Sequence, residues 1–247
     1  MWSWLTRKTE RSEGQALLQR LRERYPVYAA PHAYRRDGQL LSLAQAQENL
    51  EYLQTQRPTR LRIASDFLHT EAGVDVAVAL AGAEPAALLD GLHRWSLRVF
   101  PALQKAAPQL ARDEVWLASD RRGPEIVYSL LMDLALLLGE LILIRRPAFQ
   151  WALDLDEGNL LDGMDSVRRP VLQFLPTPTP TPTPTSTSTS TSTSTAAGDA
   201  SMPPVQLDVE ALVVHRYREP DSPSLQWMNG WAQLVQDARS GAYERVF

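Results

Sequence analysis

The chain has 247 residues, of which 44% are apolar, and its 25 Lys and Arg against 29 Asp and Glu leave a net charge of −4. This apolar content is too high for a disordered chain and too low for a polytopic membrane protein, and the length suits one large domain or two small ones. Because the chain has no cysteine, disulfide scaffolds, thiolate zinc sites, iron–sulfur clusters and thiol catalysis are excluded.

The charge is distributed unevenly along the chain. Residues 1–36 hold eight basic side chains against three acidic ones, a net of +5, so the remainder carries −9. A nucleic-acid-binding protein normally presents a net positive face, and we therefore expect no nucleic-acid partner. The basic end is typical of a solvated first helix, and the alternative is a docking end.

The N-terminus carries no pattern of a signal peptide, because charge begins at Arg7 before an apolar core can form. The most apolar run, Tyr128–Ile144, contains Asp133 and Glu140, which favours a buried core helix over a membrane span. These features predict a cytoplasmic protein. We expect Trp2 and Trp4 to pack on the domain, and the alternative is contact with a membrane surface.

The N-terminal two-thirds is predicted to be mainly helical. Ser42 and Gln45 form a capping box at the start of a helix that we expect to stop before Pro58. Pro85 suits the first position of a further helix. The apolar spacing predicts helices over 12–24, 43–57, 59–68 and 85–107, whereas 74–80 fits either a helix or a strand.

The spacing of the apolar residues changes from a helical pattern to a strand pattern after residue 145. Two strands are predicted, 149–154 and 170–174, and both strand starts read Arg-Arg-Pro-x-x-Gln followed by an aromatic residue. We expect the two strands to form an antiparallel pair. A third strand region with a short helical turn is predicted over 205–217, and a final helix over 225–238. The fold class is therefore α+β, with a mainly helical N-terminal part, a small antiparallel sheet packed on a central buried helix, and a C-terminal helix.

One segment cannot form a core. Residues 176–203 consist largely of Pro-Thr and Ser-Thr repeats, which bury too little apolar area to offset the entropy of ordering. We predict a disordered loop inside one domain of residues 12–247, preceded by a tail of residues 1–11. The alternative is a linker between two domains.

The acidic segment 154–165 is the strongest candidate for a binding site. Asp154, Asp156, Asp162 and Asp165 occupy positions 1, 3, 9 and 12 of a calcium-loop window. The match fails because Asn159 stands where the loop needs a glycine, and because position 12 is not a glutamate. The segment is therefore interpreted as a solvated acidic loop or a surface for a partner, and no metal is predicted.

Two arginine pairs flank this acidic segment, and in an antiparallel pair they start at opposite ends. Arg145 and Arg146 precede the first strand, and Arg168 and Arg169 precede the second. Pairing with protein carboxylates is the favoured interpretation, and an anion site is the alternative. A buried acid such as Asp133 or Glu140 also needs an arginine.

Catalytic motifs are not found in the sequence. The four histidines lack metal-binding spacing, and there is no nucleophile elbow or phosphate loop. We therefore predict no catalytic residue and no cofactor. A small polar cluster is interpreted as an ordinary helix end; it comprises Asp66, His69, Glu71 and Asp75.

A helix through Leu138-Gly139-Glu140 is followed by a strand with Trp151 and then by an Arg-Pro strand. Over 128–217 this order resembles small uncharacterised bacterial α+β proteins, including immunity-type proteins from toxin loci. The resemblance implies a protein partner and carries over no catalytic residue.

The expected function is that of a cytosolic, non-enzymatic protein that binds a basic protein partner, as an immunity or accessory protein does. The alternative is a metal-dependent or acid–base hydrolase that uses the carboxylates of 154–165. The residues expected to meet the partner are Asp154, Asp156, Glu157, Asp162, Asp165, Arg145, Arg146, Arg168 and Arg169.

Overall fold

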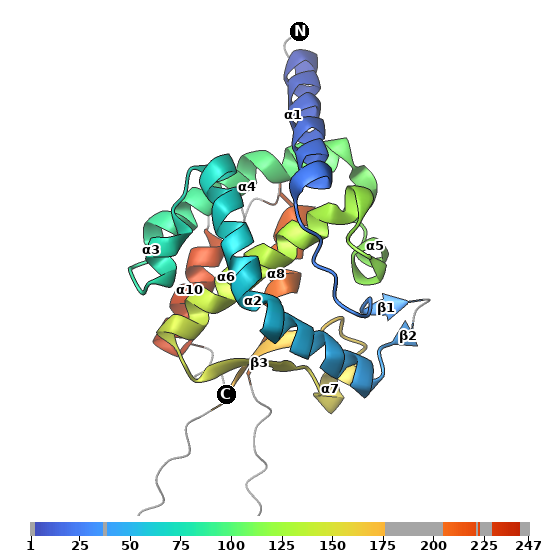
Figure 1. Cartoon of the computed structure of the whole chain (residues 1–247), viewed down its shortest axis with the longest axis vertical. Coiled ribbons are helices and arrows are strands. Elements are labelled where there is room, and N and C mark those ends of the chain that lie inside the picture. The colour runs from blue at the N-terminus through green and yellow to red at the C-terminus, as the bar shows by residue number, and fades with distance from the viewer. Residues whose placement is uncertain (1–2, 37–38, 176–204, 221, 223–228, 243–247) are drawn as a thin grey trace, which may run out of the picture.

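A computed structural model of the chain describes residues 3–36, 39–175, 205–220, 222 and 229–242 (Figure 1). Its α-helices are α1 (Ser3–Arg24), α2 (Leu43–Ala72), α3 (Val76–Leu80), α4 (Ala86–Ala106), α5 (Asp113–Ala118), α6 (Val127–Arg145), α7 (Glu157–Leu161), α8 (Val209–Arg218) and α10 (Gly230–Ser240). The 3-10 helices are η1 (Pro108–Ala111) and η2 (Gly123–Ile126). The strands are β1 (Arg35–Arg36), β2 (Gln39–Leu40), β3 (Phe149–Leu153), β4 (Pro170–Phe174) and β5 (Gln206–Leu207).

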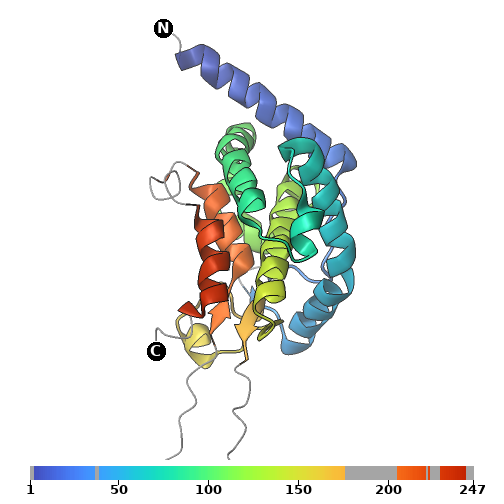
Figure 2. The same ribbon diagram turned by 90° about the vertical axis from the view of Figure 1, so that its left-hand side faces the viewer.

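Helix α6 is the centre of the fold. It lies between α2 on one side and α8 with α10 on the other (Figure 2). The segment 123–145 is the one helical stretch in the described part of the chain that is long and apolar enough to cross a membrane, and 89% of its most apolar window is buried in the fold. A helix that is apolar on every side belongs in a core. The predicted α+β class, with a buried central helix, is confirmed; the cytoplasmic location stays a prediction.

The sheet follows the predicted pairing. β3, β4 and β5 form an antiparallel sheet in that order. Phe149 pairs with Phe174 and Leu153 with Pro170, so the two arginine pairs do start at opposite ends. The third strand is much shorter than predicted, because Asp208 accepts a hydrogen bond from the backbone N–H of Ala211 and so begins helix α8.

The insert 176–203 lies outside the described residues, and the division into a tail and one domain stays a prediction. The described residues on either side of it are hydrogen-bonded to each other. The N–H of Phe174 donates to the carbonyl of Val205 at 2.9 Å, so the insert connects neighbouring strands of one sheet.

Helix α2 does not stop before Pro58, and this prediction was wrong. Proline removes one helical hydrogen bond, which normally interrupts a helix. Here both halves of α2 share one buried face, and burial of that face holds the helix together. The buried residues of α2 are Ala46, Asn49, Leu50, Leu53, Arg60, Ala64 and Leu68. The predicted capping box of Ser42 and Gln45 is confirmed.

The helix ends near Gly241 and Gly73 show the left-handed geometry that favours glycine. Gly241 has φ of 69° and terminates α10, as the sequence indicated, and Gly73 has φ of 65° at the end of α2. Asp75 then caps α3, so the ambiguous stretch 74–80 forms a helix from Val76 to Leu80 and no strand. The first residues of the predicted final helix, 225–228, lie outside the described residues, and α10 begins at Gly230.

Helix α1 begins at Ser3 instead of residue 12, and its first half extends beyond the body of the protein (Figures 1 and 2). Close packing against α4 begins at Gly14, where an added Cβ atom would lie 1.9 Å from the carbonyl oxygen of Ala102. Leu17 and Leu21 then face the core. Trp2 lies outside the described residues, and Trp4 lies in the extended half of α1.

We predict that Gly14→Ala destabilises the protein by about 1–3 kcal/mol, because the new methyl group forces α1 away from the backbone of α4. Alanine otherwise favours a helix over glycine by about 1 kcal/mol. Gly230→Ala is the matched control, since its Cβ meets nothing within 4 Å. Urea unfolding measures both variants, and equal stability of the two would contradict the close contact.

Candidate functional site

The acidic segment carries a cluster of exposed apolar side chains that the sequence analysis did not single out. Four large apolar residues within ten positions have exposed fractions between 43% and 86%. Two exposed acids, Glu157 and Asp162, stand among them. We call this surface the 155–164 face; it consists of Leu155, Glu157, Leu160, Leu161, Asp162 and Met164.

Two of the predicted partner-binding acids instead build the loop. Asp154 is fully buried and accepts hydrogen bonds from the Asp156 N–H at 3.0 Å, the Asn159 side-chain amide at 2.9 Å and the Ser166 hydroxyl at 2.5 Å. Asp156 caps helix α7 by accepting from the Asn159 N–H at 3.0 Å. These carboxylates satisfy the backbone of a tight loop, so Asp154 does not belong to a surface that meets a partner.

The third acid, Asp165, fastens the loop to the β1 strand. Its carboxylate lies 3.2 Å from the Arg35 guanidinium. Arg35 also donates to the carbonyl of Met164 at 3.4 Å. On the other side Arg168 donates to the carbonyl of Leu41. Arg35 and Arg168 therefore fasten the C-terminal end of the 155–164 face, and Glu157 and Asp162 remain as its exposed charges.

The first arginine pair lies away from the acidic segment. Arg145 donates to the carbonyls of Leu141 and Ala83, and burial lowers its pKa. The Arg146 guanidinium lies 5.6 Å from the centre of the Phe174 ring. Neither residue forms an ion pair with residues 154–165 in the described part of the chain, so this pair does not extend the 155–164 face.

Arg169 is the clearest departure from the sequence analysis, because it lies in the core and not on the surface. It is 1% exposed. Its guanidinium donates to Asp208 at 2.8 Å and to Glu210 at 3.0 Å. The same group lies 4.4 Å from the Trp116 ring and 4.8 Å from the Tyr34 ring. Arginine suits such a position, because its flat cation stacks on aromatic rings while its terminal Nη1 and Nη2 groups donate to carboxylates.

Glu210 is the centre of this buried network. It accepts hydrogen bonds from Arg121 at 2.7 Å, from Arg169 at 3.0 Å and from the Trp116 indole at 3.1 Å. Burial raises its pKa, but the two guanidinium groups outweigh burial, and the pKa lies below its usual value. Glu210 is therefore ionised and sealed between two cations.

Both non-glycine residues with positive φ in the described part of the chain border this network. Arg121 has φ of 61° and Arg168, next to Arg169, has φ of 60°. Such backbone angles are unfavourable for arginine and persist only where the surroundings enforce them. The Arg121 N–H donates to the Ser119 hydroxyl at 2.8 Å, which fixes this turn. The strained backbone at Arg121 and Arg168 therefore helps to position the arginines of the buried ion pairs.

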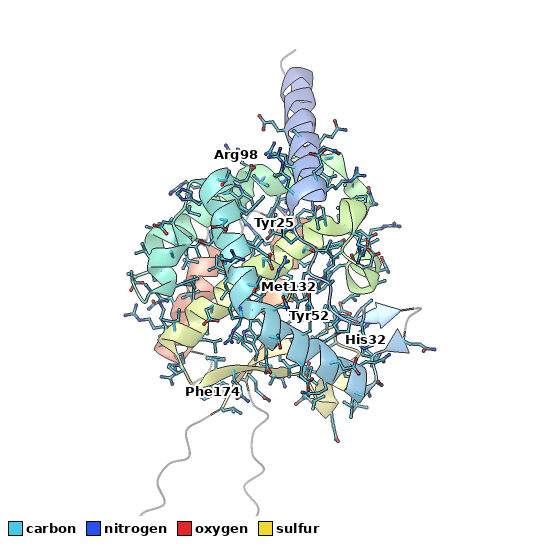
Figure 3. All side chains as sticks on the ribbon, viewed as in Figure 1. Tyr25, His32, Tyr52, Arg98, Met132 and Phe174 are labelled. Carbon is cyan, nitrogen blue, oxygen red and sulfur yellow. The ribbon has the colours of Figure 1, made fainter. Side chains whose placement is uncertain are left out.

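A second buried ion pair satisfies Asp133 at the middle of α6. Arg60 donates to both Asp133 oxygens, at 2.8 and 2.6 Å, and the Tyr25 hydroxyl donates at 2.5 Å. Figure 3 shows Tyr25 beside α6, where α1 reaches the body. Burial raises the pKa of Asp133 to about 6, although the bonds from Arg60 and Tyr25 oppose that rise. The arginine that pairs with Asp133 is therefore Arg60 of α2, and not a member of the two arginine pairs.

The geometry offers little to a metal ion or to acid–base catalysis. Among the described residues, no group of three or more His, Asp or Glu side chains is placed to hold a metal. The helix-end cluster is also structural, because Asp75 caps α3 and Glu71 pairs with Arg20 at 2.8 Å. The 155–164 face instead offers an exposed apolar surface that carries two carboxylates, those of Glu157 and Asp162.

No family model, curated protein or solved structure matches the chain. The resemblance to immunity-type proteins therefore stays a prediction.

We predict that Glu210→Gln destabilises the protein by about 3–5 kcal/mol at neutral pH, because it removes the ion pair of buried Arg121 and leaves buried Arg169 with Asp208 alone. The folded-state pKa of Glu210 is lowered, so its contribution is present above the unfolded pKa of about 4.5 and is lost as the pH falls through the folded pKa. The difference in unfolding free energy between the variant and the wild type should therefore decrease as the pH falls. Urea unfolding from pH 7 downward measures it.

Glu157→Gln is the control for this experiment. Glu157 is exposed, so we expect its replacement to change stability by less than about 0.5 kcal/mol. A Glu210→Gln variant as stable as this control would contradict the central role of the network.

Proposed function

We propose that this chain is a non-enzymatic protein that binds another protein through the 155–164 face, as an immunity or accessory protein does. The observation that carries the proposal is the exposure of Leu155, Leu160, Leu161 and Met164, with Leu161 86% exposed. These four residues lie within ten positions of the chain. Large apolar side chains exposed so close together are unfavourable in water, and they commonly mark a site that a partner covers.

The composition of the 155–164 face defines the partner's chemistry. The partner needs apolar side chains to cover the leucines and a basic group to meet Glu157 or Asp162. The loop is held in place by Arg35 and Arg168. A surface fixed before binding loses little conformational entropy when it binds, and that favours affinity.

The alternative, a hydrolase that uses these carboxylates, has less support. Catalytic acids need access to a substrate and to water. Asp154 instead is buried and accepts three hydrogen bonds, and Asp156 caps a helix. Asp165 is paired with Arg35. Three of the carboxylates of this segment, those of Asp154, Asp156 and Asp165, are thus engaged in structural contacts, which favours binding over catalysis.

We predict that Leu160→Ser with Leu161→Ser abolishes recovery of the partner, because it removes the two apolar side chains of α7. The measurement is affinity capture from the native host followed by mass spectrometry, with cross-links mapped to residues 155–164. Val78→Ser is the matched control, because Val78 is 55% exposed on α3 and lies outside the 155–164 face. The proposal fails if the double variant recovers the same stoichiometric partner, or if wild type recovers none.

We predict a separate effect of charge. Glu157→Gln with Asp162→Asn should slow association with the captured partner and weaken its dependence on salt, while dissociation changes little. Exposed charges mainly steer encounter, whereas buried apolar contacts set the lifetime of a complex. Surface plasmon resonance at low and high salt measures both rates. Unchanged association at low salt would show that the acids play no part.

A further inference from the structure

The first half of α1 extends away from the rest of the protein. Residues 3–13 lie beyond the body, and close packing on α4 begins at Gly14 (Figures 1 and 2). This stretch forms about three helical turns, and an isolated helix of that length is only marginally stable in water. A helix in this position gains stability when a second surface packs on it.

The sequence of this extended half separates its charges around the helix. Positions 4, 8 and 11 follow the spacing that places residues on one face of a helix, and they hold Trp4, Lys8 and Arg11. Glu10 and Glu13 belong to other faces, because each residue advances the helix by about 100°. One face of the extended half is therefore basic and carries an aromatic residue. We call it the 4–11 face; it consists of Trp4, Lys8 and Arg11.

The 155–164 face has the opposite character. The segment 155–164 contains three acids and no basic residue. Two of these acids, Glu157 and Asp162, are exposed, and they stand among the exposed apolar side chains of the same face. An acidic apolar surface and a basic surface with an aromatic residue complement each other in charge and in apolar area.

The two faces lie too far apart to meet within one copy of the chain. The extended half of α1 is at one end of the longest axis of the molecule, and α7 is at the opposite end (Figures 1 and 2). A contact between the two faces therefore needs a second copy. Because such a contact joins two different surfaces, each pair of copies still has one of each face free for a further contact.

We propose that the chain self-associates, with the 4–11 face of one copy bound to the 155–164 face of a second copy. The two basic residues of the helix meet Glu157 and Asp162, and Trp4 covers the exposed leucines. This inference rests on the proposed function, because it uses the same 155–164 face and names a second copy as its partner. About three turns of one helix cover less than the interface of about 1,200–2,000 Å² that is typical of stable complexes, so the association is weak and sensitive to salt.

The test is sedimentation equilibrium of the full chain over a range of protein and salt concentrations. We expect a dissociation constant of about 10–500 µM at low salt, and a mean mass that rises with protein concentration and falls as salt is added. A monomer at every concentration overturns this inference. That result is distinct from failure of the proposed function, because affinity capture would still show whether a different protein binds the 155–164 face.

Charge reversal tests which surfaces meet. Lys8→Glu with Arg11→Glu should weaken self-association at least about tenfold, and so should Glu157→Lys with Asp162→Lys. When the two variants are mixed, each helix again meets a surface of opposite charge, and we expect a complex that contains both.

Arg62→Glu with Arg94→Glu is the matched control, because it makes the same change of charge at exposed positions outside both faces. We expect this control to self-associate like the wild type, and circular dichroism verifies that all variants fold. Unchanged self-association of the two charge-reversal variants contradicts the proposal, and so does failure of their mixture to form a complex.

Discussion

The constraint on which this structure depends is the burial of Glu210 between Arg121 and Arg169. A buried charge is tolerated only when it is paired, and here one carboxylate joins three distant parts of the chain: the turn before η2, the start of β4 and helix α8. The aromatic rings of Trp116 and Tyr34 close over the Arg169 guanidinium. The start of β4 and helix α8 are thereby fixed to the turn that leads into the central helix, even though the sheet has only three short strands.

The parts of the fold that local pattern determines were predictable. The all-round apolar character of α6, the capping box of α2 and the paired strands β3 and β4 each depend on residues close in sequence, and each was confirmed. The continuation of α2 through Pro58 was not predictable in this way, because it depends on a face that α6 buries. Helix α8 replaced most of a predicted strand since Asp208 caps it.

The partners of the charged residues were much less predictable, because ion pairs join residues far apart in sequence. Arg60 meets Asp133 and Arg169 meets Glu210 across 73 and 41 positions, and no spacing rule connects them. The alternation of apolar and acidic residues around Glu210 was the available signal: Val209, Val213 and Tyr217 lie at helical spacing beside it and are buried with it. An acid on the apolar face of a helix indicates a buried partner.

The different roles of its charged and apolar side chains explain why the 155–164 face is the strongest binding candidate. The acidic segment drew attention by its charge, yet Asp154, Asp156 and Asp165 serve the protein itself. The fold holds these turns firmly but leaves Leu161 in solvent. A rigid loop with exposed leucines gains stability only when another surface covers it. The charges thus shape the loop, and its exposed apolar side chains are the basis of the proposed binding site.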